Sequence, residues 1–344
     1  MTAAASARFA RMWATDLVQV GSGWSDLDAG RWGVSVRYDG QVAGARFAKW
    51  SDQASQAGQW RGPATSDWST SMGQGEYCSA VDEVRAAIAR GDVYQANICR
   101  VLQAPLPDSA RRAVSGLDRL LAELNPSPYG GYLDIPELDL AIASASPELF
   151  LSVRWVEGRR LIRSGPIKGT GLTADDLRDK DTAENIMIVD LVRNDLSRVC
   201  RTGSVQVPHL LAVEEHPGLV HLVSYVEGEL IADATWQEIA AATFPPGSVT
   251  GAPKSSALRV IDALETRSRG PYCGAFGWID IDRGECELAV SIRTFWIEAG
   301  DLCFGTGAGI TWGSDPVAEW EETELKASRL IGAASGTWPK DGAS

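Results

Sequence analysis

Turn-separated strand sequences near the C-terminus constrain the fold of this 344-residue chain more than any other feature. Apolar and β-branched residues dominate 275–281, 286–297 and 302–304, and the connections at 282–284 and 298–301 read Asp-Arg-Gly and Glu-Ala-Gly-Asp. Gly and Asp in such short connections are typical of turns between neighbouring strands. Strands joined this closely must pair antiparallel. We therefore predict an antiparallel meander over 275–305.

Strand-forming and helix-forming segments are kept apart in the rest of the chain. Strands are predicted within 32–50, at 138–143, and as a hairpin of 149–156 and 160–163 about Glu157 and Gly158. The spacing of apolar residues predicts helices at 79–91, with Ser79 as N-cap, and at 108–124, 181–196, 235–243, 253–264 and 315–331. This segregation predicts an α+β fold in which antiparallel β-sheets form a central sandwich flanked by helices, and argues against a doubly wound parallel sheet.

No clear linker or internal repeat divides the sequence. We predict a single domain over 1–344, with 76–333 as its core. Residues 1–75 are expected to add short strands and a polar loop packed on that core, and 335–344 to form a flexible tail.

Charge and composition exclude several classes of protein. The 45 acidic residues outnumber the 32 basic ones, and the net charge of −13 argues against a nucleic-acid or anionic-membrane partner. We expect a cytoplasmic protein, because no apolar run approaches 18 residues and the N-terminus lacks a signal-peptide pattern. The six scattered cysteines are expected to be reduced thiols, and no His/Cys cluster has zinc spacing. Any metal would be a hard, oxygen-liganded cation such as Mg²⁺.

Lys168 is the one ionisable residue in the turn sequence Ser-Gly-Pro-Ile-Lys-Gly-Thr at 164–170. The turn follows the predicted hairpin and leads into an acid-rich helix. A lysine recessed there would lose hydration and become competent as a nucleophile. The alternative is an ordinary lysine in an exposed loop.

Two predicted helices carry acidic pairs three residues apart, Asp181 with Glu184 and Glu319 with Glu322. Residues at this spacing share a helix face. Two such faces brought together would supply carboxylates to Mg²⁺. Either pair alone could instead complement the positive end of its helix dipole.

The sequence alone leaves the roles of several other polar residues and glycine-rich segments open. His221 lies beside apolar residues in a predicted strand, which is typical of a core histidine. Arg293 is predicted in the middle of a strand, where it needs an anionic partner, either a substrate carboxylate or an internal glutamate. The glycines at 247–254 and 305–309 would let backbone N–H groups approach an anion or another ligand. Alternating charges around Asp195 predict a salt-bridged helix end.

Taken together, motifs in this order resemble the chorismate-utilising enzymes, and among them the component I branch of aminodeoxychorismate synthase. They extend over about three quarters of the chain, within 76–333. The matching segments are GDVYQAN at 91–97, SPE at 146–148, PIKGT at 166–170, AENIMIVDLVRND at 183–195, HLVS at 221–224, FPPGSVTGAPK at 244–254, YCG at 272–274, IRT at 292–294, GAG at 307–309 and EWEET at 319–323.

The resemblance implies roles for individual residues. It implies Mg²⁺ ligation by Glu184 and Glu322, supported by Asp181 and Glu319. The groups that it implies for holding the substrate carboxylates are Tyr272, Arg293, the backbone of Gly307, Ala308 and Gly309, and Lys326.

The resemblance implies four catalytic residues. His221 and Thr250 would face the substrate ring. Glu148 would be the general acid/base beside the departing hydroxyl, with a raised pKa. Lys168 stands where the aminodeoxychorismate branch has its nucleophile, whereas the similar anthranilate branch usually has Ala.

The implied reaction converts chorismate and ammonia to 4-amino-4-deoxychorismate, a precursor of 4-aminobenzoate and folate. Ammonia would come from a separate glutamine amidotransferase subunit, component II. The alternatives are amination at C2 to anthranilate or aminodeoxyisochorismate, hydration to isochorismate, and a non-catalytic chorismate-binding subunit.

Overall fold

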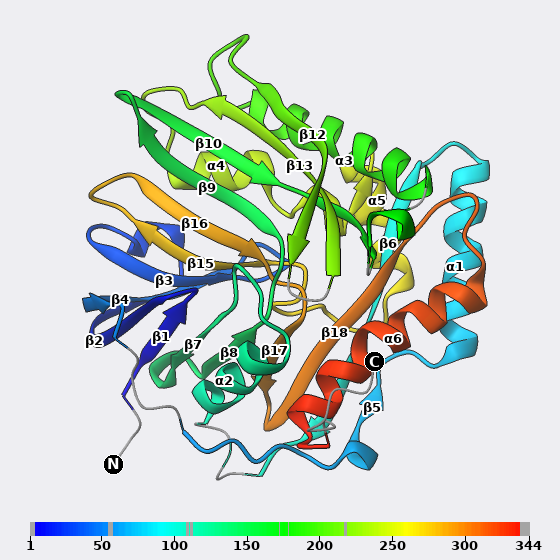
Figure 1. Ribbon diagram of the computed structural model, residues 1–344, viewed down its shortest axis with the longest axis horizontal. Helices are drawn as coiled ribbons and strands as arrows, with labels where there is room; N and C mark the ends of the chain where they lie inside the picture. Colours follow the sequence, from blue (N-terminus) through cyan, green and yellow to red (C-terminus); the bar gives the residue numbers. More distant parts are fainter. Residues whose placement is uncertain are drawn as a thin grey trace.

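Antiparallel strands make up the centre of the computed structural model, and helices lie outside them (Figure 1). The structure describes residues 4–53, 58–107, 110, 113–171, 173–177, 179–216 and 219–337. Over these residues the strands belong to one hydrogen-bonded network of 18 strands. The predicted α+β class, with antiparallel strands flanked by helices, is confirmed.

One arm of the network follows the pairing order β4, β3, β15, β16, β9, β10, β13 and β12, with β11 also paired to β13. The bounds of these strands are β3 Arg31–Val36, β4 Val42–Ser51, β9 Leu149–Val156, β10 Arg159–Gly165, β11 Ile167–Gly171, β12 Gln206–His216, β13 Leu219–Glu229, β15 Ala275–Asp280 and β16 Glu285–Val290.

The other arm continues from β4 through β2, β1, β7, β8, β17, β18 and β6, with the short β5 and β14 on β6. The bounds of these strands are β1 Ser6–Phe9, β2 Met12–Gly21, β5 Ser69–Thr70, β6 Gln95–Pro105, β7 Gly131–Ile135, β8 Leu140–Ser144, β14 Gly251–Ala252, β17 Thr294–Glu298 and β18 Asp301–Ile310. β3 and β4 account for the strands expected within 32–50. β1 and β2 lie in the N-terminal region where short strands were expected, but their positions were not predicted.

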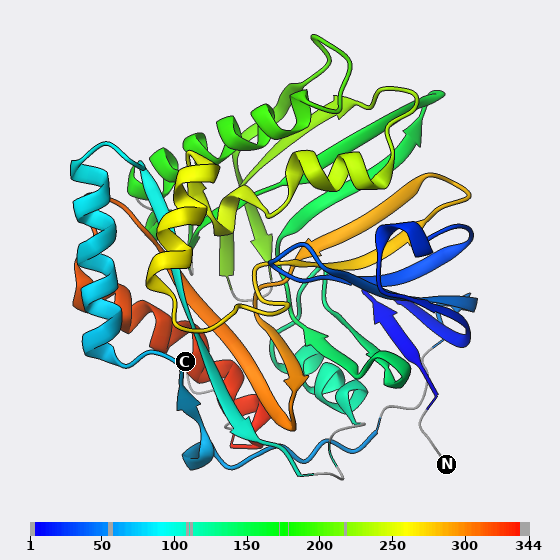
Figure 2. The same ribbon diagram turned by 180° about the vertical axis from the view of Figure 1, so that it is seen from behind.

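Six α-helices within the described ranges surround the strands. They are α1 Gln74–Ala89, α2 Val114–Leu124, α3 Asp179–Ser197, α4 Trp236–Thr243, α5 Lys254–Leu264 and α6 Pro316–Ala334. α3 packs against β13 and α4, while α1 packs against α6. Figure 2 shows α4 and α5 on the face opposite to that in Figure 1. The tail predicted at 335–344 falls outside the described residues from 338 onward.

Side chains fix several helix ends where the sequence predicts them. Thr235 and Glu238 form a reciprocal capping box at the start of α4. The Asp315 carboxylate accepts hydrogen bonds from the first backbone N–H groups of α6. The predicted start of α1 is wrong. The helix begins at Gln74, where the Glu76 carboxylate accepts a hydrogen bond of 2.8 Å from the N–H of Gly73.

The second predicted helix begins later than expected, because α2 starts at Val114 and not at 108. Residues 108–109 and 111–112 of that prediction lie outside the described ranges. The 149–163 hairpin is confirmed, and its turn residues Glu157 and Gly158 both have positive φ, 51° and 76°. Such angles match the twist of the paired strands.

The predicted C-terminal meander is confirmed only in part, as the two hairpins β15–β16 and β17–β18. Among the described strands β16 pairs next with β9 and β17 with β8, so the two hairpins lie in different arms of the network. Residues 286–297 form two strands, β16 and β17, and not one. Arg293 has a φ of 52°, a left-handed value that interrupts an extended strand. The prediction of Arg293 in mid-strand is therefore wrong, because the residue lies at a bend between strands.

A buried arginine ties α6 to the strand beneath it. Arg100 on β6 is 1% exposed and donates to the hydroxyl of Thr323 at 3.0 Å. Its guanidinium also pairs with Glu324 and lies 4.1 Å from the ring centroid of Trp320. These contacts fix the rotation of α6, and so decide which of its side chains point inward. Among the described helices, none is long and apolar enough to cross a membrane.

Candidate active site

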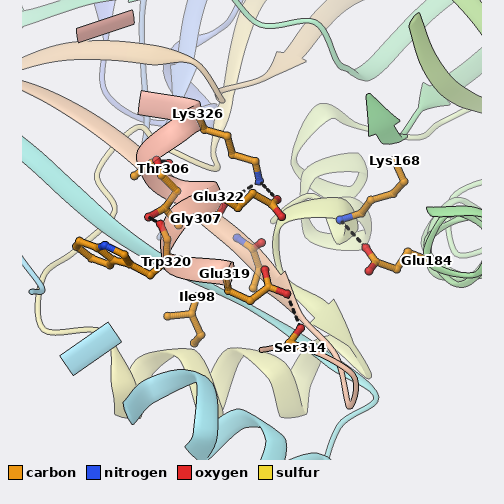
Figure 3. Close-up of polar contacts among 12 residues, drawn as sticks. Ile98, Lys168, Glu184, Thr306, Gly307, Ser314, Glu319, Trp320, Glu322 and Lys326 are labelled. Carbon is orange, nitrogen blue, oxygen red and sulfur yellow. Dashed lines mark hydrogen bonds and ion pairs between the residues drawn. The ribbon is translucent and has the colours of Figure 1, made fainter. Parts of the chain in front are cut away.

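A cavity of about 760 Å³ opens between α3, α6, β11 and β18, a size suited to a small-molecule ligand. Figure 3 shows Lys168 and Glu184 on one side of this region and Glu322 and Lys326 on the other. The cavity brings together most of the residues proposed from the sequence. They are Glu148, Lys168, Asp181, Glu184, His221, Tyr272, Arg293, Gly307, Gly309, Glu319, Glu322 and Lys326.

Two of the proposed residues do not line this cavity. Thr250 is fully buried, and its hydroxyl donates to the carbonyl oxygens of Pro246 at 3.0 Å and Gly247 at 3.3 Å. Ala308 packs into an apolar cluster under α1 and α5. Thr250 therefore holds a turn, and the Ala308 side chain supports β18 from behind.

Lys168 lies on β11 with its side chain only 16% exposed, which rules out the exposed-loop alternative. Its Nζ is 3.8 Å from Oε2 of Glu184. On its other side lies Gly309, where an added Cβ would be 3.6 Å from Nζ and would overlap the side-chain amide of Gln95. Glycine at 309 thus leaves room for the side-chain amide of Gln95 against β18, and the lysine amine lies at an ordinary contact distance from the same position.

Glu148 lies in the wall of the same cavity and is 4% exposed. Burial raises the pKa of Glu148 to about 7, against opposing effects of the Ser248 hydrogen bond and the charges of Lys168 and Arg293. A carboxyl with this pKa is partly protonated near neutral pH, as expected for a group that both donates and accepts a proton.

The two acidic helix faces meet in the cavity together with two lysines. Nζ of Lys180 on α3 stands 3.4 Å from Oε1 of Glu319 and 3.7 Å from Oε1 of Glu184. Nζ of Lys326 lies 2.6 Å from Oε1 of Glu322 and donates to the carbonyl of Gly307 at 3.0 Å. The carboxylates of this cavity are thus compensated by lysine side chains.

The two glutamates of α6 differ in their surroundings. Burial acts to raise the pKa of Glu322, but the charges of Lys326, Lys180 and Lys168 outweigh it, so the pKa lies below its ordinary value. Glu322 therefore stays ionised, as a metal ligand must. Oε1 of Glu319 accepts a 2.6 Å hydrogen bond from the hydroxyl of Ser314, which fixes its orientation.

The acidic residues fit a hard cation such as Mg²⁺. Oε1 of Glu184 is buried, yet it accepts no hydrogen bond from the part of the chain that the structure describes. Native proteins rarely leave such an atom unsatisfied, and a cation would satisfy it. Within the described ranges, no three His, Cys, Asp or Glu side chains already form a complete metal site. Mg²⁺ commonly takes one or two protein carboxylates and keeps several waters, so it needs no such complete set.

Tyr272 and Arg293 provide hydrogen-bond donors on the opposite wall. Burial raises the pKa of Tyr272 well above its ordinary value, so its hydroxyl stays protonated. Its ring packs against β18 where Gly305 stands, and a Cβ there would overlap the ring. Burial lowers the pKa of Arg293, an effect that the charge of Glu148 opposes. A guanidinium beside a neutral hydroxyl suits a carboxylate ligand.

His221 on β13 is 2% exposed and also lines the cavity. It is therefore both a buried residue and a residue of the candidate site. Asn97, Lys180 and Ser248 also line this cavity, and no role was predicted for them from the sequence. Lys180 stands four residues before Glu184, a spacing that could have indicated an ion pair on the same helix face.

The last residue of the glycine-rich segment at 247–254 forms an internal ion pair. Nζ of Lys254 lies 2.6 Å from Oδ2 of Asp195 and donates to the carbonyl of Thr243 at 2.9 Å. This pairing confirms the salt-bridged end of α3. All six cysteines are free thiols.

Comparison with known proteins places these features in a family. The family model described as chorismate binding enzyme matches residues 35–332. Anthranilate synthase component 1 of Aquifex aeolicus is 37% identical over 283 residues, covering 79% of this chain and 55% of the relative. Aminodeoxychorismate synthase component 1 of Klebsiella aerogenes is 36% identical over 279 residues, covering 78% of this chain and 59% of the relative. The chain thus spans just over half the length of these relatives.

Solved structures agree with the fold. Anthranilate synthase component I from Streptococcus pneumoniae TIGR4 superposes with a TM-score of 0.74 at 27% identity, covering 88% of this chain and 80% of that one. MenF, the menaquinone-specific isochorismate synthase from Escherichia coli, has a TM-score of 0.76 at 18% identity, which supports the fold alone. This match covers 96% of the chain and 88% of MenF. The chain belongs to the chorismate-binding enzyme family.

Proposed function

We propose that the protein aminates chorismate at C4 to give 4-amino-4-deoxychorismate, as the aminating component of an aminodeoxychorismate synthase. Relatives named for the anthranilate and aminodeoxychorismate reactions are almost equally similar to the chain, at 37% and 36% identity. Overall similarity therefore favours neither branch. The observation that carries the proposal is Lys168, recessed in the cavity wall near Glu148.

The substrate would be held through its two carboxylates. Arg293 and Tyr272 would bind one of them, with the backbone of β18 at Gly307 beside it. The ring carboxylate would face α3 and α6, where Glu184 and Glu322 would hold Mg²⁺, with Asp181 and Glu319 in support. When bound, Mg²⁺ would draw charge from the ring as a Lewis acid.

The chemistry needs a nucleophile and a proton donor. In the proposed first step, neutral Lys168 adds through Nζ to C2 of the ring while the C4–O bond breaks. Glu148 gives its proton to the departing oxygen, which leaves as water. Ammonia then adds at C4, the C2–N bond to Lys168 breaks, and Glu148 takes up the proton that the new amine releases. The enzyme returns to its starting state, and atoms and charge balance.

The ammonia source is proposed to be a partner subunit. Relatives of this chain are named as component 1 enzymes, which implies a second component. We propose a glutamine amidotransferase in that role, in the cytoplasm, with the product feeding 4-aminobenzoate and folate synthesis.

Product identification tests the proposal. The purified protein would be incubated with chorismate, MgCl₂ and ammonium at mildly alkaline pH, together with a lyase that converts 4-amino-4-deoxychorismate to 4-aminobenzoate. Chromatography should show 4-aminobenzoate, and EDTA should abolish it. Anthranilate or isochorismate as the product would overturn C4 amination but not the family. No turnover even with an amidotransferase and glutamine would indicate a non-catalytic relative.

A further inference from the structure

A buried ion pair between Glu265 and Arg269 lies behind the wall of the large cavity, and neither residue is among those that line it. Glu265 is the residue at which α5 ends, and Arg269 follows in the connection to β15. The Arg269 side chain is 1% exposed and that of Glu265 7%. Nε and Nη2 of Arg269 donate to the two carboxylate oxygens, at 2.9 and 2.6 Å. Because removing two charges from water is costly, a buried pair often adds little net stability.

The pair is also bonded to the main chain of two distant segments. Nη2 of Arg269 donates to the carbonyl of Asn97 on β6 at 2.7 Å, and Nη1 donates to the carbonyl of Val249 at 2.8 Å. Oε1 of Glu265 accepts a 2.8 Å hydrogen bond from the N–H of Cys99, also on β6. The pair therefore joins the end of α5 to β6 and to the turn that contains Val249.

The segments joined in this way supply one side of the large cavity. Asn97, Val249 and Tyr272 all line it. The N–H of Tyr272 donates to the carbonyl of Arg269 at 3.1 Å, so a third lining segment is fixed to the same residue. These three lining residues belong to separate parts of the sequence, and Arg269 is bonded to the main chain of each.

We propose that Arg269 is a positioning residue for substrate binding. From behind the wall it sets the relative places of Asn97, Val249 and Tyr272, and with them the shape of the side of the cavity that holds a substrate carboxylate. Glu265 supplies the balancing charge that lets the guanidinium be buried. The inference rests on the proposed function only in taking chorismate as the ligand and Tyr272 as a contact to it.

The shape of the guanidinium suits this role. It is planar and presents its N–H groups at fixed angles, so bonds to two carbonyls and one carboxylate hold all three groups in one arrangement. A lysine ammonium would keep the charge, but it lacks the fixed fork and stands on a flexible stem. Without the fork the bonded segments can shift against one another. A displacement of about 1 Å in a site can cost about 100-fold in activity, even when the changed residue is far from the chemistry.

The pair and the reacting groups belong to different segments. Lys168 is on β11, which pairs with β13, and Glu148 directly precedes β9. None of the hydrogen bonds described for Arg269 is made to those strands. Loss of the guanidinium should therefore weaken the binding of chorismate more than it slows the chemical step.

Arg269→Lys tests this while the buried charge stays balanced. We expect KM for chorismate to rise about tenfold, with kcat within about threefold of that of the unmodified protein. Calorimetric titration of chorismate in EDTA, where no product is expected, measures Kd without turnover. The Kd should rise by about the same factor as KM.

Arg8→Lys is the matched control. Arg8 forms a pair of the same two-bond kind with Asp118 on α2, at 2.6 and 2.5 Å, and its Nη1 also donates to a main-chain carbonyl, that of Ala10. The two side chains of this pair are 14% and 4% exposed, and neither is among the residues that line the cavity. This variant should lose stability to urea as Arg269→Lys does, while KM and Kd keep the values of the unmodified protein.

Equal KM and Kd values in Arg269→Lys and Arg8→Lys would overturn the inference, because Arg269 would then be no more than structural. A fall in kcat at unchanged KM would overturn it as well. Should Arg269→Lys fail to fold, Glu265→Gln combined with Arg269→Met removes both charges at similar volume, and the same rise in KM and Kd is expected. The readouts are chorismate consumption and binding, so product identity separately decides the proposed function.

Discussion

Nζ of Lys180 on α3 lies 3.4 Å from Oε1 of Glu319 on α6, so a cation bridges the two helices that carry the candidate metal ligands. The same Nζ is 3.7 Å from Oε1 of Glu184, the buried oxygen that accepts no hydrogen bond within the described ranges. Lys180 thus occupies the region where a metal ion would compete for the same oxygens. A metal ion that binds Glu184 has to displace this ammonium, or it has to bind close to it against the repulsion between the two positive charges.

Replacing Lys180 with Met should tighten Mg²⁺ binding in the absence of chorismate. An ammonium near the site repels the cation and occupies its ligands, although the 41% exposure of this side chain means that solvent screens part of the effect. We expect an affinity about three- to tenfold higher, a free-energy change of about 1 kcal/mol. Isothermal titration calorimetry with MgCl₂ measures this directly.

Lys49→Met is the control for that experiment, because Lys49 is exposed on β4, away from the lining of the cavity. Its Mg²⁺ affinity should match that of the unmodified protein. Weaker binding in Lys180→Met would instead mean that the lysine holds the two acidic helices in place for the metal.

The raised pKa of Glu148 predicts a dependence of stability on pH. Its ordinary value of 4.5 applies to the unfolded chain, and burial raises it to about 7 in the folded one. Between these values the folded state binds more protons, so the free energy of unfolding falls as pH rises from 4.5 to 7. This group should account for a loss of about 3 kcal/mol across that window.

Glu148→Gln separates this effect from other titrations. The neutral amide cannot ionise, so the difference in unfolding free energy between the variant and the parent should grow in favour of the variant as pH rises to 7. Urea unfolding at several pH values measures it. The same variant should lose about 100-fold or more in kcat, because the proton donor is gone. A difference that does not change with pH would refute the raised pKa.

Close packing of the Gln95 amide against β18 predicts that a side chain at Gly309 disturbs this wall of the cavity. A Cβ at 309 would lie 2.3 Å from Nε2 of Gln95, so the amide would have to move, and it would stand at an ordinary contact distance of 3.6 Å from Nζ of Lys168. Gly309→Ala should therefore displace the Gln95 amide and lower kcat/KM by up to about tenfold. Gly313→Ala is the matched control, since a Cβ there meets nothing within 4 Å. Steady-state kinetics in which both variants behave alike would contradict this packing.

Local patterns predicted much of the fold and some of the site. The two-residue turn at Glu157 and Gly158 and the cap at Asp315 depend on neighbouring residues alone, so the sequence reveals them. Acidic residues three apart share a helix face in any setting, and both predicted pairs do line one cavity.

Features that depend on distant contacts were not predictable. The bend at Arg293 interrupts residues that otherwise favour a strand, and the need to turn the chain from β16 to β17 decides it. The start of α1 is different, because its signal is local and was missed: the Glu76 carboxylate accepts from the N–H of Gly73, whereas the hydroxyl of Ser79 bonds back to the carbonyl of Gly75. The contact between Lys180 and Glu319 joins residues 139 positions apart, and no local pattern encodes it.

The rate of 4-aminobenzoate formation by Lys168→Ala in the lyase-coupled assay shows whether Lys168 is the nucleophile. Lys49→Ala, an exposed lysine on β4, serves as the control and should retain full activity. If Lys168 forms the bond to C2, its loss should reduce C4 amination by about 1,000-fold or more while chorismate still binds. Formation of 4-aminobenzoate by Lys168→Ala at a rate near that of the control would show that Lys168 is not the nucleophile.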